Sequence, residues 1–129
     1  MTENYFSDRV AIFNANTYKV ERKVSMGCPQ ESCCGPGFWN ILYNTVLNLE
    51  FSSHTKVIAF ADDLVILMQR KTPYEAEVYA NSDIARIEKW ANDNKMHSKE
   101  SKSKAMLITR KRSNDVNNIH LNKRRMEQV

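Results

Sequence analysis

The sequence predicts a small α+β domain, with an antiparallel sheet and two amphipathic helices packed on one face of it. Short apolar segments of strand length predict the sheet, and two longer segments with apolar residues every three or four positions predict the helices. The strands are joined by tight turns as well as by helices, which favours an antiparallel sheet. With 129 residues, 42% of them hydrophobic and 26% charged, the chain fits one globular domain.

The first part of the chain predicts a hairpin, a loop and a helix. Two extended runs in Arg9–Ser25 flank Asn14–Asn16, a plausible turn. Met26–Gly37 holds all three glycines and two of the three prolines, so a loop with special backbone angles is expected there. A helix is expected over residues 38–50, because apolar residues recur at helical spacing, namely at Trp39, Leu42, Val46 and Leu49.

The second part predicts a hairpin, a helix, a strand and another hairpin. Val57–Met68 has the pattern of strand, turn and strand. Thr72 is a candidate cap for a helix over residues 74–93, with Glu75 three residues after the cap. A strand over Ala105–Arg110 is expected to join the hairpin in one sheet, and the last residues are expected to turn at Asn122–Lys123. The expected buried residues are Trp39, Leu42, Val46, Ile58, Val65, Ile84, Ile87 and Trp90.

Cysteine usage and hydropathy exclude several classes of protein. Cys28, Cys33 and Cys34 are an odd number, so they form no disulfide framework and suit a reducing compartment. A structural zinc site would need a fourth ligand, and small buried thiols beside the loop are expected instead. No apolar run approaches the roughly 20 residues that span a bilayer, and the N-terminus lacks the pattern of a secretory signal. An intracellular protein without a membrane segment is therefore expected.

Charge is distributed unevenly along the chain. Residues 95–129 hold ten Lys and Arg against three Asp and Glu, a net of +7, whereas residues 1–94 carry a net of −3. A basic surface of this kind can attract a phosphate polymer, with Lys99, Lys104, Arg110, Lys111 and Arg112 as candidate contacts. The same charges are also compatible with an ordinary solvated face or a basic tail.

Two adjacent aspartates interrupt the most apolar stretch of the sequence. Asp62 and Asp63 fall where the tip of the Val57–Met68 hairpin is expected. Two carboxylates so close repel each other, and a divalent cation removes that conflict. Hard oxygen ligands suit magnesium, which is usually held by one or two carboxylates together with substrate phosphates. The alternative is a plain type I′ turn, in which aspartate is common.

Three motifs in series resemble one known family. "FADD" between two apolar strands resembles the active-site hairpin of reverse transcriptases, and "GCPQESCCGPGFWNILYN" (Gly27–Asn44) resembles the block that precedes it. "WANDNKMHSKESKSKAMLITRKR" (Trp90–Arg112) resembles the segment that follows it. The resemblance covers nearly the whole chain and is nearest to the non-LTR (LINE-type) retrotransposons.

The resemblance implies RNA-directed DNA synthesis from a primer, a template and dNTPs, with Mg²⁺ or Mn²⁺ as cofactor. Asp62 and Asp63 match the metal ligands of the hairpin, and Phe60 and Ala61 match the residues that line it near the primer end. Gln30 matches the residue beside the incoming nucleotide and the template. Lys102 matches a lysine that assists the phosphates, although Lys104 competes for this role and Lys102 can equally be an ordinary surface lysine.

The resemblance also implies that residues 1–129 are a fragment, the central and late palm of the domain. The fingers, the first palm strand with the family's third aspartate, and the thumb have no counterpart, because Asp8 is the only aspartate before Gln30. Glu31 and Ser98 replace a glycine and an asparagine that the family usually has. The isolated chain is therefore expected to be inactive, and a functional polymerase of this kind is expected in the nucleus. The alternatives are a non-catalytic nucleic-acid-binding remnant of a retrotransposon and a gene-model fragment without function.

Overall fold

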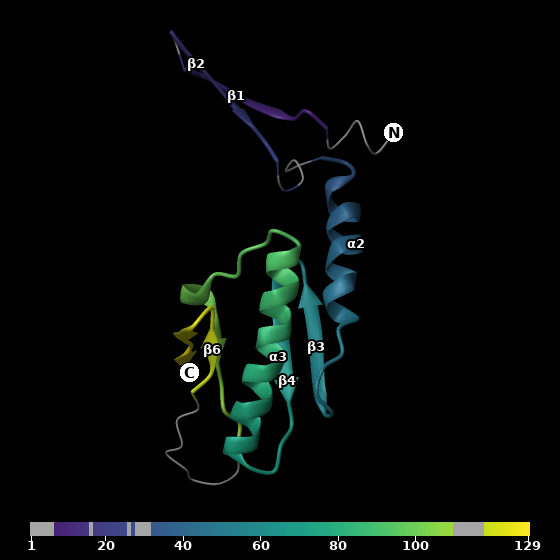
Figure 1. Cartoon of the computed structure of the whole chain (residues 1–129), viewed down its shortest axis with the longest axis vertical. Coiled ribbons are helices and arrows are strands. Elements are labelled where there is room, and N and C mark those ends of the chain that lie inside the picture. The colour runs from purple at the N-terminus through teal and green to yellow at the C-terminus, as the bar shows by residue number, and fades with distance from the viewer. Residues whose placement is uncertain (1–6, 16, 26, 28–31, 110–117) are drawn as a thin grey trace. The chain divides into compact units, whose positions relative to one another are not determined.

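The computed structural model describes residues 7–15, 17–25, 27, 32–109 and 118–129 (Figure 1). The chain divides into two compact units, Met1–Trp39 and Asn40–Val129. In the described residues, no helix is both long enough and apolar enough to cross a membrane. The α+β class is confirmed, because the structure combines two α-helices with antiparallel strand pairs.

The first unit contains the expected N-terminal hairpin. Strands β1 (Val10–Ala15) and β2 (Tyr18–Lys23) pair antiparallel, with Val10 opposite Lys23 and Ala15 opposite Tyr18. Every residue of both strands is exposed. Within this unit, Cys33 and Cys34 are exposed free thiols, so the expectation of buried thiols is wrong for these two residues. Cys28 lies outside the described residues.

Helix α2 begins in the first unit and ends in the second. It spans Gly35–Leu47, three residues earlier at each end than the sequence pattern predicts. The Ser32 hydroxyl explains the early start, because it accepts a hydrogen bond of 2.9 Å from the Gly35 amide and satisfies a free N–H at the helix terminus. Trp39 and Leu42 are only half-buried, whereas Val46 is fully buried.

The second unit places a hairpin, a long helix and a set of short strands around one core. Strands β3 (Thr55–Phe60) and β4 (Asp63–Met68) pair antiparallel, and helix α3 (Pro73–Asp93) follows them. Thr72 caps α3 as expected, accepting a hydrogen bond of 3.2 Å from the Glu75 amide. The remaining elements are η1 (Glu100–Lys102), β5 (Lys104–Ala105), β6 (His120–Leu121), β7 (Arg124–Arg125) and β8 (Glu127–Gln128).

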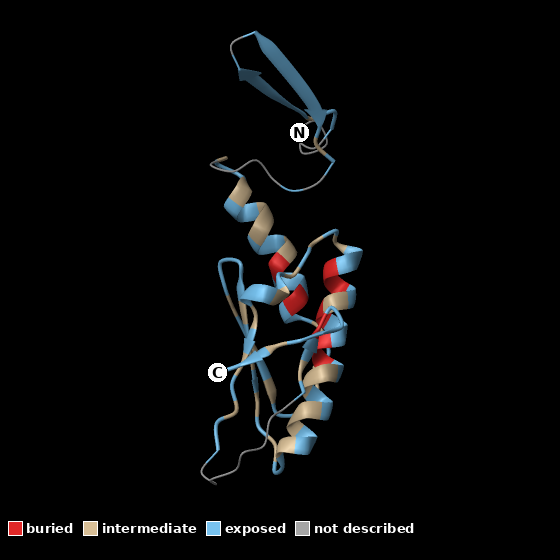
Figure 2. Ribbon diagram, turned by 90° about the vertical axis from the view of Figure 1, so that its left-hand side faces the viewer, coloured by how far each residue is buried: buried red, intermediate tan, exposed pale blue. Residues whose placement is uncertain are grey.

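The core lies between α2 and α3 (Figure 2). The Trp90 ring of α3 meets the Tyr43 ring of α2 edge-on, with centroids 6.1 Å apart, and Trp90 Nε1 donates a hydrogen bond of 2.8 Å to the Thr45 hydroxyl. An edge-to-face pair of this kind adds about 1 kcal/mol to the burial of the rings. Ile84 and Ile87 are buried at 8% and 7% exposure, which confirms the predicted packing of α3.

The predicted face of the β3–β4 hairpin is wrong. Ile58 and Val65, expected to be buried, are 51% and 50% exposed, while their neighbours Val57 and Ile66 are more buried. Side chains alternate between the two faces of a strand, so one face of the hairpin packs and the other faces solvent. The sequence does contain a signal for this, because the two charged residues of the strands, Lys56 and Asp63, both alternate onto the exposed face.

The predicted three-stranded sheet is also wrong in the described residues. There, β3 pairs only with β4, and β5 pairs in parallel with β8, with Lys104 opposite Glu127. The short strand β8 is thus the partner of β5, in place of the predicted β3–β4 hairpin. The C-terminal hairpin β6–β7 turns at Asn122–Lys123 as predicted, with positive φ at both residues.

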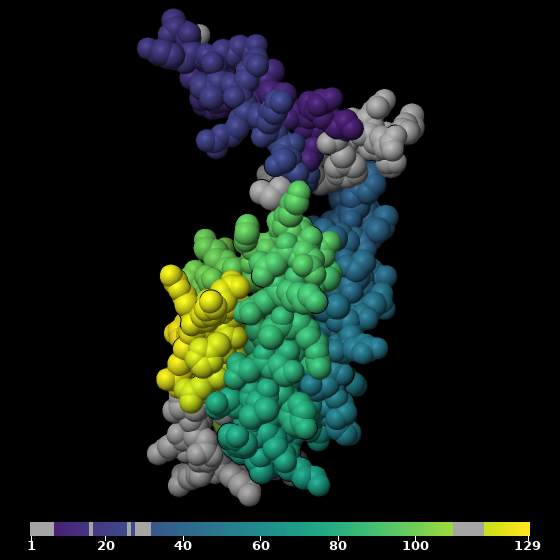
Figure 3. Space-filling view, viewed as in Figure 1, coloured from purple at the N-terminus to yellow at the C-terminus, as the bar shows by residue number. Residues whose placement is uncertain are grey.

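Polar side chains of α3 hold the C-terminal hairpin, whose atoms (yellow) lie against the green part of the chain in Figure 3. Glu77 accepts a hydrogen bond from the Asn118 amide, and Asn81 bonds both the Asn118 carbonyl and the His120 amide at 2.9–3.0 Å. Glu88 accepts from the Asn122 amide. Side chains of α3 thus bond the backbone of every second residue of the segment 118–122. Leu121, which lies between two of these residues, is buried.

Candidate active site

The β3–β4 hairpin carries the aspartate pair at its tip, as the sequence predicts. Phe60 and Asp63 form the last strand pair, and Ala61 and Asp62 form a two-residue turn between them. Ala61 has a φ of +52°, and Asp62 is not in this region, so the turn is not the type I′ turn considered above. A side chain in the left-handed region costs about 1–2 kcal/mol, so the tip is held in a strained conformation.

Both aspartates are exposed. Asp62 lies in the turn, whereas Asp63 is the first residue of β4 and shares its strand face with Val65 and Leu67. Two adjacent carboxylates in solvent offer hard oxygen ligands and leave the other positions of an ion to water or phosphate. Among the described residues, no group of three or more His, Cys, Asp or Glu could hold a metal ion, so the pair has no third carboxylate there.

Tyr43 of α2 anchors the tip of the hairpin. Its hydroxyl donates a hydrogen bond of 3.1 Å to the backbone carbonyl of Asp62. Burial of the ring, followed by the negative charges of Asp62 and Asp63, raises the pKa of the Tyr43 hydroxyl. A phenol is protonated at neutral pH even at its ordinary pKa, and the upward shift extends the range over which the hydroxyl remains a donor to higher pH. It also shows that the phenol lies within electrostatic reach of both aspartates.

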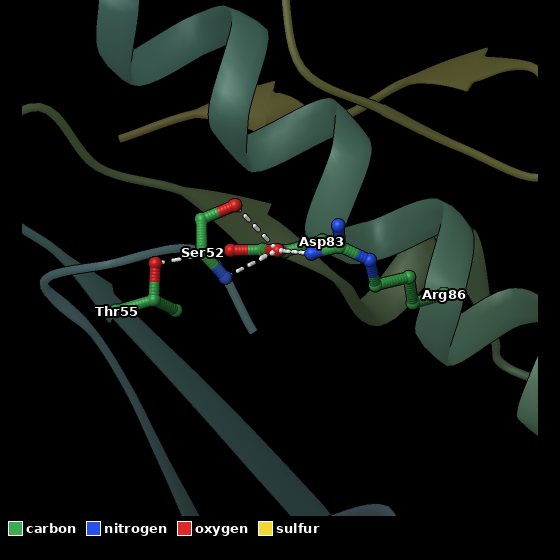
Figure 4. A network of polar contacts seen from close by, with 4 residues as sticks. All are labelled: Ser52, Thr55, Asp83 and Arg86. Carbon is green, nitrogen blue, oxygen red and sulfur yellow. Dashed lines mark hydrogen bonds and ion pairs between the residues drawn. The ribbon is translucent and has the colours of Figure 1, made fainter. Parts of the chain in front are cut away.

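Asp83 of α3 anchors the opposite end of the hairpin (Figure 4). Its fully buried carboxylate accepts hydrogen bonds from the Ser52 amide (3.0 Å), the Ser52 hydroxyl (2.9 Å) and the Thr55 hydroxyl (3.0 Å). Arg86, one turn later on α3, completes the set with an ion pair of 2.5 Å. Thr55 is the first residue of β3, so this network fixes the beginning of the strand against α3.

These two anchors hold the aspartate pair on a rigid support. Asp83 and Trp90 lie on the same helix, and Trp90 packs against the Tyr43 ring that bonds the hairpin tip. Helix α3 therefore positions β3 directly at its beginning and, through Tyr43, at its end. A metal or substrate site needs side chains that are fixed by packing and by hydrogen bonds of this kind.

The other predicted site residues are only partly in the described structure. Phe60 is 81% exposed beside the turn, and Ala61 is exposed in it. Lys102 ends η1 and is exposed, and no contact joins it to the aspartates in the described part of the chain. The competing Lys104 is paired with Glu127 at 3.4 Å. The predicted residues Gln30, Arg110, Lys111 and Arg112 lie outside the described residues.

A basic surface forms where η1 meets the C-terminal hairpin. The Asn122 side chain joins the two, donating hydrogen bonds to the Ser98 carbonyl (3.4 Å) and to Glu100 Oε1 (2.9 Å). That bond from Asn122, with a backbone hydrogen bond of Glu100 and the charge of Arg124, lowers the pKa of Glu100. We call this the η1 surface. Its exposed basic residues are Lys99, Lys102, Lys123, Arg124 and Arg125.

Sequence reasoning missed Tyr43 and Asp83, which position the pair. Asp83 carried a usable signal, because it sits next to Ile84 on the apolar stripe of α3, where a charged residue needs buried partners. Tyr43 lies one turn before Val46 on the buried face of α2, and an aromatic residue there reads as ordinary core. Nothing in the pattern indicated that its hydroxyl reaches the hairpin.

Known proteins provide an independent comparison. Residues 1–127 match the family model of the reverse transcriptases (RNA-dependent DNA polymerases). The Pol polyprotein of the type-1 retrotransposable element R1 2 of Nasonia vitripennis is 37% identical over 82 residues, which cover 64% of this chain and 20% of that protein. The 115 kDa protein of the element R1DM of Drosophila melanogaster is 31% identical over 88 residues, which cover 68% of this chain and 8% of that protein.

The chain thus spans at most about a fifth of the length of these two relatives. No solved structure matches it. The family match covers nearly all of the chain and includes the hairpin with the aspartate pair, the preceding block and the following segment. The chain therefore belongs to the reverse transcriptase (RNA-dependent DNA polymerase) family, and these relatives are proteins of R1 retrotransposable elements.

Proposed function

We propose that this chain is the central and late palm of an RNA-directed DNA polymerase, which adds dNTPs to a primer 3′-hydroxyl on an RNA template. One observation carries the proposal: an exposed aspartate pair lies at the tip of a hairpin that Tyr43 of α2 fixes at the tip and Asp83 of α3 fixes at the beginning. Family membership agrees with this chemistry. The exposed tip of the hairpin would present negative charge to a substrate, while the packed face of the hairpin anchors the hairpin in the fold.

Asp62 and Asp63 are the proposed ligands of Mg²⁺ or Mn²⁺. Both side chains are exposed, both end in hard oxygens, and neither is paired with a cationic side chain in the described residues. When bound, such an ion activates the attacking hydroxyl and stabilises charge on the phosphates. Two carboxylates hold an ion only weakly, so substrate phosphates and a further carboxylate are needed to complete the site.

Other residues are assigned to the substrates. Phe60 and Ala61 are proposed to lie beside the primer end, because they flank the aspartates at the exposed tip. Gln30 is assigned to the nucleotide and template by the family resemblance. Lys102 is proposed to assist the phosphates, and its freedom from an ion pair in the described residues favours it over Lys104, which is paired with Glu127.

The η1 surface is the proposed contact for nucleic acid. Its five exposed cations come from two segments that Asn122 holds together, so the charge is concentrated rather than spread along a tail. Arg110, Lys111 and Arg112 are proposed to extend it. A non-catalytic remnant of a retrotransposon would also bind nucleic acid through this surface, and such a remnant is the second candidate function. We propose a nuclear location for the polymerase and for the remnant alike.

Primer extension on an RNA template with a DNA primer and magnesium tests the proposal. We expect no extension by the 129-residue chain alone, because the proposed two-metal site needs a further carboxylate that the aspartate pair lacks among the described residues, and because positioning accounts for much of the rate. We expect extension when the chain is expressed within a longer polypeptide from its own reading frame. Asp62→Asn with Asp63→Asn should abolish this activity, whereas Asp93→Asn on the exposed end of α3 should not.

Two results would contradict the proposal. Extension that survives the double substitution would exclude the aspartate pair as the metal site. If the longer polypeptide binds RNA in a salt-sensitive way but extends no primer with any metal ion, the result would support the non-catalytic nucleic-acid-binding remnant instead.

A further inference from the structure

Two neighbouring cysteines of the first unit have no role in the packing or in the proposed polymerase chemistry described above. Cys33 and Cys34 are both free and both exposed, whereas cysteine is among the residue types that are most often fully buried in proteins. An exposed free thiol can be reached by thiophilic ligands. The pair is therefore a candidate for chemistry that needs two sulfurs.

A hydrogen-bonded turn holds the two cysteines side by side. The Gly35 amide donates to the Ser32 carbonyl at 3.2 Å and to the Ser32 hydroxyl at 2.9 Å, which closes a four-residue turn. Cys33 and Cys34 are the two central residues of this turn, and neither has a positive φ. On the other side, the Phe38 amide donates to the Cys34 carbonyl at 3.1 Å. The backbone of the pair is thus held before a ligand arrives, which lowers the entropy cost of bringing both sulfurs to it.

The spacing of the pair disfavours a disulfide and favours a ligand between the sulfurs. The Cys33–Cys34 peptide bond is trans, and consecutive Cα atoms across a trans peptide lie about 3.8 Å apart. The Cα atoms of disulfide-bonded cysteines are usually about 4.4–6.8 Å apart, so a direct bond between these neighbours would distort the turn. A single atom that bonds both sulfurs keeps them further apart and removes this constraint.

The number and the kind of donor atoms restrict the ligand. A structural zinc ion takes four ligands, and among the described residues no group of three or more His, Cys, Asp or Glu could hold a metal ion. Thiolates select soft centres, whereas Mg²⁺ and Mn²⁺ prefer oxygen donors. The ligand must therefore be thiophilic and must be satisfied by two sulfurs, and a trivalent arsenical of the type R–As=O meets both requirements.

We propose that Cys33 and Cys34 form a dithiol site for trivalent arsenicals. In this reaction two As–S bonds form, the As=O bond and the two S–H bonds break, and the oxygen leaves with both thiol protons as water. Arsenic stays trivalent, so no oxidant or reductant is needed. After the first As–S bond has formed, the neighbouring thiol reacts at a high effective concentration, so the adduct of the pair is more stable than that of a single thiol.

Phenylarsine oxide and intact-mass spectrometry test the proposal on the 129-residue chain. One equivalent should add one phenylarsine group with loss of one water, and should consume two of the three thiols. Excess 2-mercaptoethanol, a monothiol, should leave the adduct in place, whereas dithiothreitol, a dithiol, should remove it. The assay measures neither primer extension nor RNA binding, so its failure is distinct from failure of the proposed polymerase.

Three serine variants identify the sulfurs. Cys33→Ser and Cys34→Ser each keep two thiols, and in each the resistance to 2-mercaptoethanol should fall by about a hundredfold or more. Cys28→Ser keeps the pair and is the matched control, so its adduct should be as resistant as that of the wild type. Both substituted thiols of the pair are exposed, so these variants should fold, and circular dichroism checks this.

Peptide mapping of the wild-type adduct locates the arsenic without any variant. Cleavage after Glu31 separates Cys28 from the pair, and the added mass should stay on the fragment that contains Cys33 and Cys34. The proposal is overturned if the added mass lies on the fragment with Cys28, or if Cys28→Ser loses the adduct. It is also overturned if Cys33→Ser or Cys34→Ser resists the monothiol as well as the wild type does.

Discussion

Replacing Asp83 by alanine should release the beginning of β3 and destabilise the second unit by about 3 kcal/mol. The substitution removes a fully buried acceptor of three hydrogen bonds from Ser52 and Thr55. Hydrogen bonds to a charged group contribute about 1.5–3 kcal/mol each, so their sum is an upper bound of several kcal/mol. After the substitution, the Ser52 and Thr55 hydroxyls can rotate towards water, and the half-exposed Arg86 keeps part of its hydration. Both effects lower the net loss of stability towards the about 3–5 kcal/mol that is typical when one partner of a buried ion pair is removed.

Urea denaturation followed by circular dichroism and by tryptophan fluorescence measures this loss. Trp90 is buried beside Tyr43, so its emission reports on the core between α2 and α3. Asp83→Asn keeps the shape and one acceptor and should cost about 2 kcal/mol. The matched control is Asp93→Ala at the exposed end of the same helix. A free energy of unfolding for Asp83→Ala within about 0.5 kcal/mol of the control would refute the role given to this network.

Three further predictions concern the tip and the η1 surface. Ala61→Gly should raise the free energy of unfolding by about 1 kcal/mol, because glycine adopts a φ of +52° without strain; destabilisation would contradict the strained turn. Because the pKa of Tyr43 is raised in the folded state, its protonated hydroxyl contributes stability at pH values below the ordinary tyrosine pKa. This contribution is lost as the pH rises through the pKa of the folded state. The stability difference between wild type and Tyr43→Phe should therefore shrink in alkali, while the exposed Tyr74→Phe shows no such trend. Binding to single-stranded RNA through four phosphate contacts should give a log–log salt slope of roughly −3, and Lys99→Ala with Lys102→Ala should reduce it by about 1.4; an unchanged slope would exclude these lysines.

Local patterns were sufficient for most of the helices and hairpins. The Thr72 cap and its bond to the Glu75 amide follow from a side chain that satisfies a free N–H. Asn122–Lys123 adopts the positive φ at both residues that a type I′ turn requires. The helical spacing of Ile84, Ile87 and Trp90 identified the buried face of α3. Each of these features depends on residues that are close together in the sequence.

Features that depend on distant residues were not predictable in the same way. Ile58 and Val65 were assigned to the wrong face, because both faces of the hairpin carry apolar residues and the exposed face is marked only by Lys56 and Asp63 near the strand ends. The pairing of β5 with β8 rather than with β4 depends on residues that are far apart in the sequence, since residues 106–126 separate the two strands. The aspartate pair was found from the sequence because it interrupts an apolar run, whereas the anchors Tyr43 and Asp83 required the tertiary structure.

Paramagnetic broadening by Mn²⁺ in a ¹⁵N-resolved NMR spectrum tests the central claim most directly. The claim is that the tip of the β3–β4 hairpin is a metal-binding site. Substoichiometric Mn²⁺ should broaden the amide signals of Ala61, Asp62 and Asp63 first, and excess Mg²⁺ should restore them. The broadening should disappear in Asp62→Asn with Asp63→Asn and persist in Asp93→Asn. Broadening that is equal in the double variant, or that begins elsewhere in the chain, would contradict the assignment of Asp62 and Asp63 as metal ligands.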